Sequence, residues 1–290
     1  MKNFNFVASK VELRKVRVND SLSLAYVDEG TGTQTLLFVH GLGSYQKAWL
    51  KNIPALSGQY RCIAVDLPGY GTSDGISGGY AMTFFASVLA DFIRTLQLER
   101  VVLVGHSMGG QIALHLALAA PDLLSRLVLV APAGFELFSA QEKLWFQQVY
   151  TPAWVAAATP EQIRSNFKLN FFRMPEDANL MIEDRIRLSS DPGFDAYCAM
   201  VPRCVQGMLE EPVLERLSDI RLPSLIVFGA EDILIPNRLL HPGLTTQQVA
   251  ETGRDKLPDS RLIMVPEAGH FVQWEKATEV NQAILDFLKN

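Results

Sequence analysis

Apolar residues in the first half of the chain alternate between short strand-like runs and longer stretches with helical spacing. The short runs are rich in β-branched and aliphatic residues, as expected for interior strands buried on both faces. They lie at residues 35–40, 62–66, 101–104 and 127–130. Between residues 80 and 98, apolar residues recur along one helix face, and Thr83 is the expected N-cap. The alternation predicts an α/β fold with a mostly parallel sheet and helices on both faces.

The two ends of the chain complete this sheet. Residues 11–18 and 22–27 interleave apolar and polar positions and predict an antiparallel pair. Strand character returns at residues 225–228 and 262–265, and the amphipathic stretch at 277–288 predicts a closing helix.

The pattern changes in the middle of the chain. Residues 135–217 contain helix-like segments with several aromatics and prolines but no convincing interior strand. We therefore predict a core formed by residues 1–134 and 218–290, interrupted by a helical cap at 135–217. Residues 236–258 are long for a connection, and we interpret them as a surface excursion in preference to an insertion near the site.

Composition narrows the class of protein. The 290 residues are 48% hydrophobic and 20% charged, with a net charge of −5 that argues against nucleic-acid binding. The N-terminal residues lack a signal-peptide pattern, and no stretch is apolar enough to span a bilayer, so we expect a cytoplasmic protein. Cys62, Cys198 and Cys204 are odd in number and lack metal-ligand spacing, so reduced thiols are expected.

The run Gly105-His106-Ser107-Met108-Gly109 carries the strongest chemical signal. It follows an apolar strand and precedes a helix-like stretch, which predicts a nucleophile elbow with Ser107 at its tip. Glycines at this point allow a strained backbone to approach its neighbours closely. The alternatives for this pattern alone are an ordinary glycine-rich turn and a phosphate-binding loop.

A serine nucleophile needs a base, and five histidines compete for that role. His270 directly follows the last apolar strand and is the predicted base. His40 is expected to brace a loop, and His115 lies within an apolar helix as a core residue. His106 is expected to point away from the nucleophile, and His241 has no supporting neighbours in the sequence.

The predicted acid is Asp232, which follows the strand at residues 225–228. We prefer it to the adjacent Glu231 as the carboxylate that orients His270. The order of serine, then acid, then histidine is typical of α/β-hydrolases.

The backbone N–H groups of Leu42 and Met108 are the expected oxyanion donors, because a glycine-flanked loop and the elbow place them at one sheet edge. Asp66 also follows a strand, but its turn is interpreted as structural. No motif indicates a binding site for a metal or an organic cofactor. A small-molecule substrate is the expected partner, and a homodimer is an open possibility.

Together these motifs resemble the α/β-hydrolase superfamily over essentially the whole chain. They are the His40-Gly41 loop, the turn at residues 66–73, the Ser107 elbow, Asp232 and His270. The resemblance implies an eight-stranded sheet, a cap over the pocket and an acyl-enzyme mechanism. The branches of that superfamily that use an aspartate nucleophile are excluded by Ser107.

Within the serine branch, residues 269–275 are similar to the histidine region of meta-cleavage-product hydrolases, which split carbon–carbon bonds. The resemblance implies Arg185 as a substrate-binding residue. The sequence departs from that family, which has asparagine at the position of His106 and tryptophan at that of Phe271.

A carboxylic-ester hydrolase acting on a small apolar substrate is therefore the leading hypothesis, with Trp49 and Phe271 as expected pocket residues. Carbon–carbon bond cleavage of diketo acids is the alternative. A hydrolase-like small-molecule receptor is the hypothesis from another class.

Overall fold

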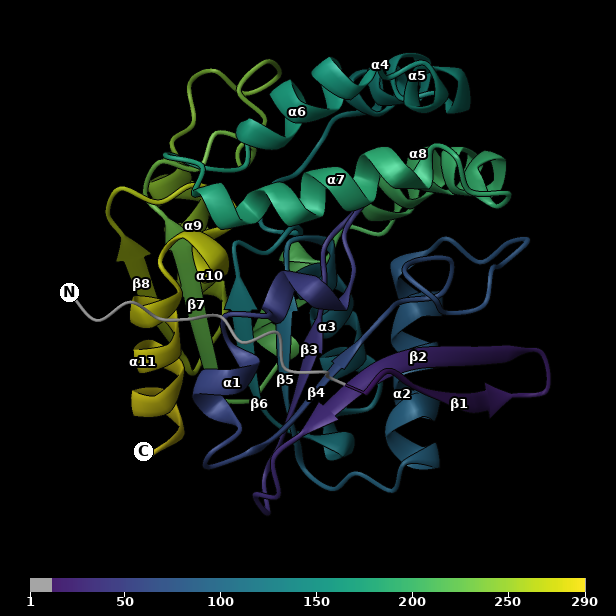
Figure 1. Ribbon diagram of the computed structural model, residues 1–290. Coiled ribbons are helices and arrows are strands. Elements are labelled where there is room, and N and C mark those ends of the chain that lie inside the picture. Colours follow the sequence, from purple (N-terminus) through teal and green to yellow (C-terminus); the bar gives the residue numbers. More distant parts are fainter. Residues whose placement is uncertain (1–11, 290) are drawn as a thin grey trace.

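The structure of the protein is a computed structural model that describes residues 12–289. Its centre is an eight-stranded sheet with the order β1-β2-β4-β3-β5-β6-β7-β8 (Figure 1). The strands are β1 (Arg14–Asn19), β2 (Leu22–Glu29), β3 (Thr35–Val39), β4 (Arg61–Val65), β5 (Val101–His106), β6 (Leu124–Val130), β7 (Ser224–Gly229) and β8 (Ser260–Val265). β2 is antiparallel to both β1 and β4, and the pairings from β4 to β8 are parallel. The predicted fold class is confirmed; residue 11 of the first predicted strand lies outside the described residues.

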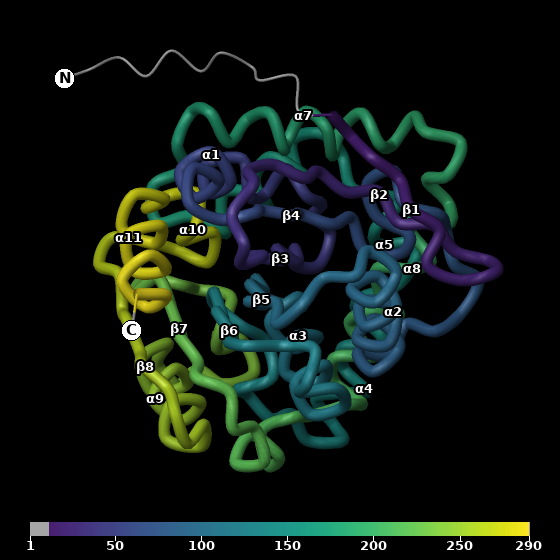
Figure 2. Tube along the Cα trace, turned by 90° about the horizontal axis from the view of Figure 1, so that it is seen from below, coloured from purple at the N-terminus to yellow at the C-terminus, as the bar shows by residue number. Residues whose placement is uncertain are grey.

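Both faces of the sheet are covered, as the apolar runs predicted. In β5, Val101 and Leu103 belong to one core cluster, whereas Val102 and Val104 belong to the other, as the period of two in a strand requires. The first cluster includes α2 (Met82–Thr95) and α3 (Met108–Ala119). The second includes α1 (Ile53–Leu56) and α11 (Ala277–Leu288). Figure 2 shows these two groups of helices on opposite sides of the strands.

The predicted N-cap at Thr83 is wrong. Helix α2 begins at Met82 and has Ala81 at its N-cap without a side-chain hydrogen bond. Thr83 instead donates its N–H and its hydroxyl to the Glu211 carboxylate, at 2.8 and 2.7 Å. A carboxylate at this end satisfies exposed N–H groups and interacts favourably with the helix dipole. The cap of α2 therefore comes from a residue 128 positions away in the chain.

Five α-helices lie between β6 and β7 in the chain, with no strand at residues 135–217. They are α4 (Ala140–Val149), α5 (Pro152–Ala156), α6 (Pro160–Lys168), α7 (Asn179–Leu188) and α8 (Phe194–Glu210). Figure 1 shows them together above the sheet. Ser139 and Thr159 start α4 and α6 with capping boxes, so local side-chain chemistry fixes where these helices begin.

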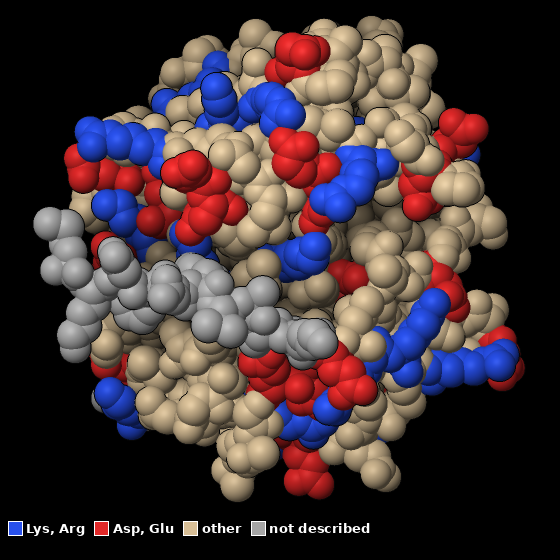
Figure 3. All heavy atoms as spheres, in the orientation of Figure 1, with Lys and Arg blue, Asp and Glu red and all other residues tan. Residues whose placement is uncertain are grey.

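The long connection between β7 and β8 contains helix α9 (Thr246–Lys256), which packs on both strands. The remaining short elements are η1 (Gln46–Trp49), η2 (Pro121–Leu123), η3 (Glu176–Ala178), η4 (Leu214–Asp219) and α10 (Val272–Glu275). Over residues 12–289, we find no helix with the length and apolar character needed to cross a bilayer. On the face seen in Figure 3, basic and acidic side chains of the described residues are interspersed.

Candidate active site

Ser107 occupies a sharp turn between β5 and α3. Its backbone has φ 53° and ψ −119°, a conformation that side-chain-bearing residues rarely adopt. A Cβ on Gly105 would lie 2.4 Å from the Gly109 carbonyl oxygen, and one on Gly109 would lie 2.4 Å from the Val39 carbonyl oxygen. The neighbours of Ser107 along the chain are buried, but Ser107 itself is partly exposed. The local backbone thus has the form of the predicted elbow.

Asp232 and His270 are hydrogen-bonded to each other. Oδ2 of Asp232 lies 2.7 Å from Nδ1 of His270, and both side chains are buried. The other carboxylate oxygen, Oδ1, accepts hydrogen bonds from the N–H groups of Leu234 and Ile235 at 2.8 and 3.1 Å. A carboxylate only accepts, so Nδ1 of His270 carries the proton in this hydrogen bond, and a neutral imidazole then has an unprotonated Nε2.

Ser107 and His270 line one cavity of about 580 Å³, between the sheet edge and the helices of residues 135–217. Leu42 and Phe271 also line it. The other lining residues are mostly apolar side chains from two regions of the chain. They include Phe135, Leu137, Phe138, Phe146, Val205, Met208 and Leu209 from one region, and Ile233, Leu234 and Leu239 from the other. The cavity thus joins Ser107 and His270 to a largely apolar chamber.

Two predicted substrate-binding residues lie elsewhere. Trp49 is fully buried in the core and is absent from the cavity wall. The Arg185 guanidinium packs over the rings of Phe194 and Tyr197, at 5.5 and 4.9 Å, and is also absent from the wall. The Met108 side chain is buried in the core, so only its backbone can serve as the predicted donor. Residue type alone does not reveal which side of an element faces a cavity.

The structural interpretations of His40 and Asp66 are confirmed. His40 is buried, donates from Nδ1 to the Gly41 carbonyl at 2.8 Å and accepts the Leu67 N–H at Nε2, at 3.0 Å. Burial lowers the pKa of His40 to about 4, so this brace is a neutral imidazole. Asp66 accepts N–H groups from neighbouring turns, and burial raises the pKa of its carboxyl to about 6.

Glu275 stabilises the loop that carries His270, a role for which the sequence offers no signal. Its carboxylate accepts the N–H of Gly269 at 2.8 Å and those of Phe172 and Arg173 at 3.0 and 2.6 Å. The histidine loop is thereby bound to a segment between α6 and α7. Arg173 and Glu275 lie 102 positions apart in the chain.

Comparison with known proteins agrees with this architecture. A model of the alpha/beta hydrolase fold family matches residues 34–277. The chain belongs to this family. This α/β-hydrolase is 31% identical to the dihydrolipoyllysine-residue acetyltransferase component of an acetoin cleaving system from Pseudomonas putida, over 90% of the chain. The match spans 65% of the length of that relative.

A second relative of this α/β-hydrolase is the 2-hydroxy-6-oxononadienedioate/2-hydroxy-6-oxononatrienedioate hydrolase of Paraburkholderia phymatum. The two are 31% identical over 92% of this chain and 91% of that protein. The solved structure of a thermophilic esterase from Thermogutta terrifontis has the same fold, with a TM-score of 0.76 and 24% identity over 96% of this chain and 98% of that one. The predicted resemblance to both groups is therefore confirmed at the level of the family.

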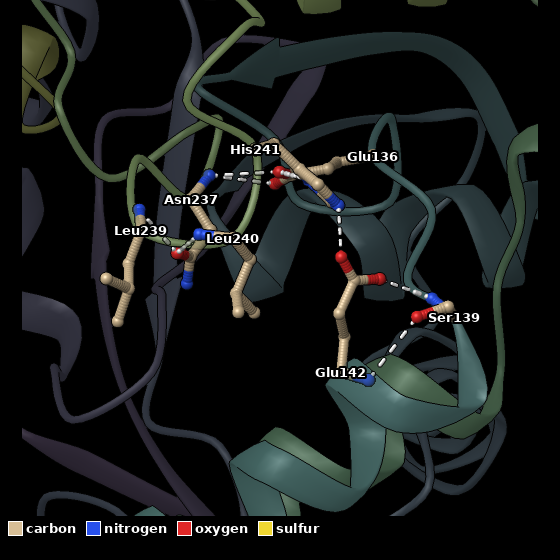
Figure 4. Close-up of polar contacts among 7 residues, drawn as sticks. All are labelled: Glu136, Ser139, Glu142, Asn237, Leu239, Leu240 and His241. Atoms are coloured by element: carbon tan, nitrogen blue, oxygen red, sulfur yellow. Dashed lines mark hydrogen bonds and ion pairs between the residues drawn. The ribbon is translucent and has the colours of Figure 1, made fainter.

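In this α/β-hydrolase, the connection at residues 236–258 is not a remote surface excursion, because Asn237, Arg238 and Leu239 line the cavity. His241 has no supporting neighbours in the sequence, but the structure gives it two partners from a distant segment. Nδ1 of His241 pairs with Glu136, and its Nε2 lies 3.0 Å from Oε1 of Glu142 on α4 (Figure 4). We call these three residues the His241 clasp. The clasp connects two chain segments that both line the cavity.

The His241 clasp should make stability depend on pH. Burial lowers the pKa of His241. The hydrogen bonds and charges of Glu136 and Glu142 raise this pKa by more than burial lowers it, so the net shift is upward. Its stabilisation is therefore complete below the unfolded-state pKa of about 6.5 and is lost as pH rises through the higher folded-state pKa. At pH 6, His241→Phe should lower the free energy of unfolding by about 1–3 kcal/mol, because Glu136 loses a buried partner.

Urea unfolding of the wild type and His241→Phe at pH 6 and pH 9 measures this effect. The difference between the two proteins should shrink at pH 9. Phenylalanine retains the ring that stacks on Phe138, so the comparison isolates the polar contacts. An equal difference at both pH values would contradict an ionic contribution.

Proposed function

We propose that this chain is a serine hydrolase that acts through an acyl-enzyme on carboxylic esters of small apolar acids or alcohols. The observation that carries the proposal is the Asp232–His270 hydrogen bond beside a cavity that Ser107 and His270 share. The strained backbone of Ser107 adds to this support, since such strain is typical of a nucleophile at an elbow.

In the proposed reaction, Nε2 of His270 removes the hydroxyl proton of Ser107 as the oxygen attacks the ester carbonyl carbon. Asp232 stabilises the imidazolium that forms and keeps its ring in the productive orientation. The proton then passes to the departing alkoxide, and an acyl-enzyme remains. Water, activated by the same histidine, adds to the acyl group and releases the acid.

The oxyanion donors in this proposal are the backbone N–H groups of Leu42 and Met108. Leu42 lines the cavity, and Met108 is the first residue of α3, directly after the nucleophile. N–H groups in the first turn of a helix have no partner within the helix, which leaves that of Met108 available. Such a donor typically lowers a barrier by about 3 kcal/mol.

The size and character of the cavity support a small apolar substrate. Its volume of about 580 Å³ is within the range of sites for drug-sized ligands, and aromatic and aliphatic side chains form most of its wall. We also infer that the segment at residues 135–217 acts as the predicted cap, because it supplies Phe138, Phe146 and Val205 to that wall.

Carbon–carbon bond cleavage in an acidic diketone is a second candidate, favoured by one observation. Lys143 and Arg238 line the cavity, and neither forms an ion pair within residues 12–289. These cations offer partners for a substrate carboxylate. Arg185, in contrast, packs outside the cavity wall and lends this candidate no support.

A panel of p-nitrophenyl esters with acyl chains of increasing length, run beside a 2-hydroxy-6-oxo-dienoate, tests the proposal. We expect ester turnover and labelling by a fluorophosphonate at Ser107. Turnover of the dienoate alone would favour the second candidate. A receptor would be favoured if these compounds raised the melting temperature of the protein but were not turned over, and if the fluorophosphonate did not label Ser107.

A further inference from the structure

His106 contacts the proposed base although it precedes the proposed nucleophile in the chain. Its Nε2 lies 3.0 Å from the backbone carbonyl oxygen of His270. The ring centre of His106 is 4.8 Å from that of His270 and 4.7 Å from that of Phe271. The side chain is 1% exposed, so its packing leaves little room for another ring position.

The direction of this hydrogen bond follows from its partner. A carbonyl oxygen only accepts, so Nε2 of His106 carries the proton and donates it. Burial and the neighbouring His270 lower the pKa of His106 well below the ordinary imidazole value, which keeps the ring neutral. Its Nδ1 has no hydrogen-bond partner among the described residues. The ring therefore contributes one hydrogen bond, and the His270 backbone receives it.

This hydrogen bond differs from the other contacts that hold the histidine loop. Glu275 binds the N–H of Gly269, and the Asn170 carbonyl accepts the N–H of Phe271, both on the side of the helices at 135–217. Asp232 orients the His270 ring from the loop after β7. His106, in contrast, is the last residue of β5, and a peptide bond joins it to Ser107. Its hydrogen bond thus connects the backbone of the proposed base to the residue that precedes the proposed nucleophile.

We propose that His106 is a positioning residue whose hydrogen bond to the His270 carbonyl sets the separation between the general base and Ser107. This inference rests on the proposed function. Proton transfer during nucleophilic attack requires the two side chains within hydrogen-bond reach, and a displacement of about 1 Å can lower a rate by about 100-fold. Loss of the bond therefore lowers kcat far more than it changes KM, because His106 contributes only a small part of the cavity wall.

The experiment compares two histidines that make the same kind of bond. His115 on α3 is also buried, its Nε2 lies 3.1 Å from the Glu211 carbonyl oxygen, and it does not line the cavity. His106→Phe and His115→Phe each remove one imidazole-to-carbonyl hydrogen bond and retain an aromatic ring. Urea unfolding measures the stability of both variants, and kcat, KM and the rate of the first acylation are measured with one p-nitrophenyl ester.

We expect His106→Phe to lower kcat and the acylation rate by about 10- to 100-fold, with KM within about threefold of the wild type. His115→Phe should keep kcat within about twofold, because its bond lies away from the reacting groups. His106→Gln should recover much of the lost rate, since its amide N–H can donate to the same carbonyl. If His106→Phe does not fold, His106→Met, which also lacks a donor, replaces it.

Two results would overturn the inference while the proposed function stands. One is ester turnover by His106→Phe equal to that of His115→Phe. The other is a His106→Gln variant as impaired as His106→Phe. Wild-type protein without ester turnover or Ser107 labelling would contradict the proposed function itself, and the inference with it.

Discussion

Ser107→Ala should lower kcat for ester hydrolysis by about 10⁵- to 10⁶-fold, the loss typical when a serine nucleophile is removed. Without the hydroxyl no acyl-enzyme forms, and only the oxyanion donors and substrate binding remain to assist attack by water. The fold should be unchanged, because alanine meets the same backbone strain as serine at φ 53°. Initial rates with a p-nitrophenyl ester, and the mass increase on fluorophosphonate labelling, provide the measurement.

Ser165→Ala is a suitable control for this comparison. Ser165 is exposed on α6 and does not line the cavity, so its removal should leave rate and labelling unchanged. A loss in kcat of less than about 100-fold in Ser107→Ala would show that another group is the nucleophile.

The sheet could be predicted from the sequence because its strands are determined by local composition. The run at residues 101–104 is apolar on both faces, and it becomes β5 at the centre of the sheet. The closing helix is observed at Ala277–Leu288, as predicted, since its apolar residues follow a single face against the core. Signals of this kind depend on residues within one or two turns of each other.

The position of the candidate chemistry could be predicted for a related reason. Parallel strands present their carboxyl ends at one edge of the sheet, so residues that follow β5, β7 and β8 meet there. Asp232 and His270 follow β7 and β8, and they form a hydrogen bond.

Contacts between distant segments could not be predicted. His241 and its partner Glu136 are 105 positions apart, and Thr83 and Glu211 are 128 apart. Neither pair shows a local pattern, because tertiary packing decides which loop lies beside which helix. Trp49 illustrates the same limit, since an aromatic side chain suits a core and a pocket equally well.

Asp232→Asn should lower kcat by about 10⁴-fold while the protein stays folded. The new amide can still accept the N–H groups of Leu234 and Ile235 through its oxygen. Its NH₂ group then faces Nδ1 of His270, so the imidazole proton moves to Nε2, where it blocks the base from accepting the serine proton. Rates with a p-nitrophenyl ester, together with urea unfolding, separate this effect on the tautomer from a loss of stability.

Two neighbouring carboxylates provide matched controls for Asp232→Asn. Glu231 is adjacent in the chain but exposed, so Glu231→Gln should keep kcat within about twofold. Asp66 also follows a strand, but its carboxylate accepts backbone N–H groups from Gln46 and Thr72 and not from a histidine. Asp66→Asn should therefore alter stability more than kcat. A loss of less than about tenfold in Asp232→Asn, or an equal loss in Glu231→Gln, would be incompatible with Asp232 as the group that orients His270.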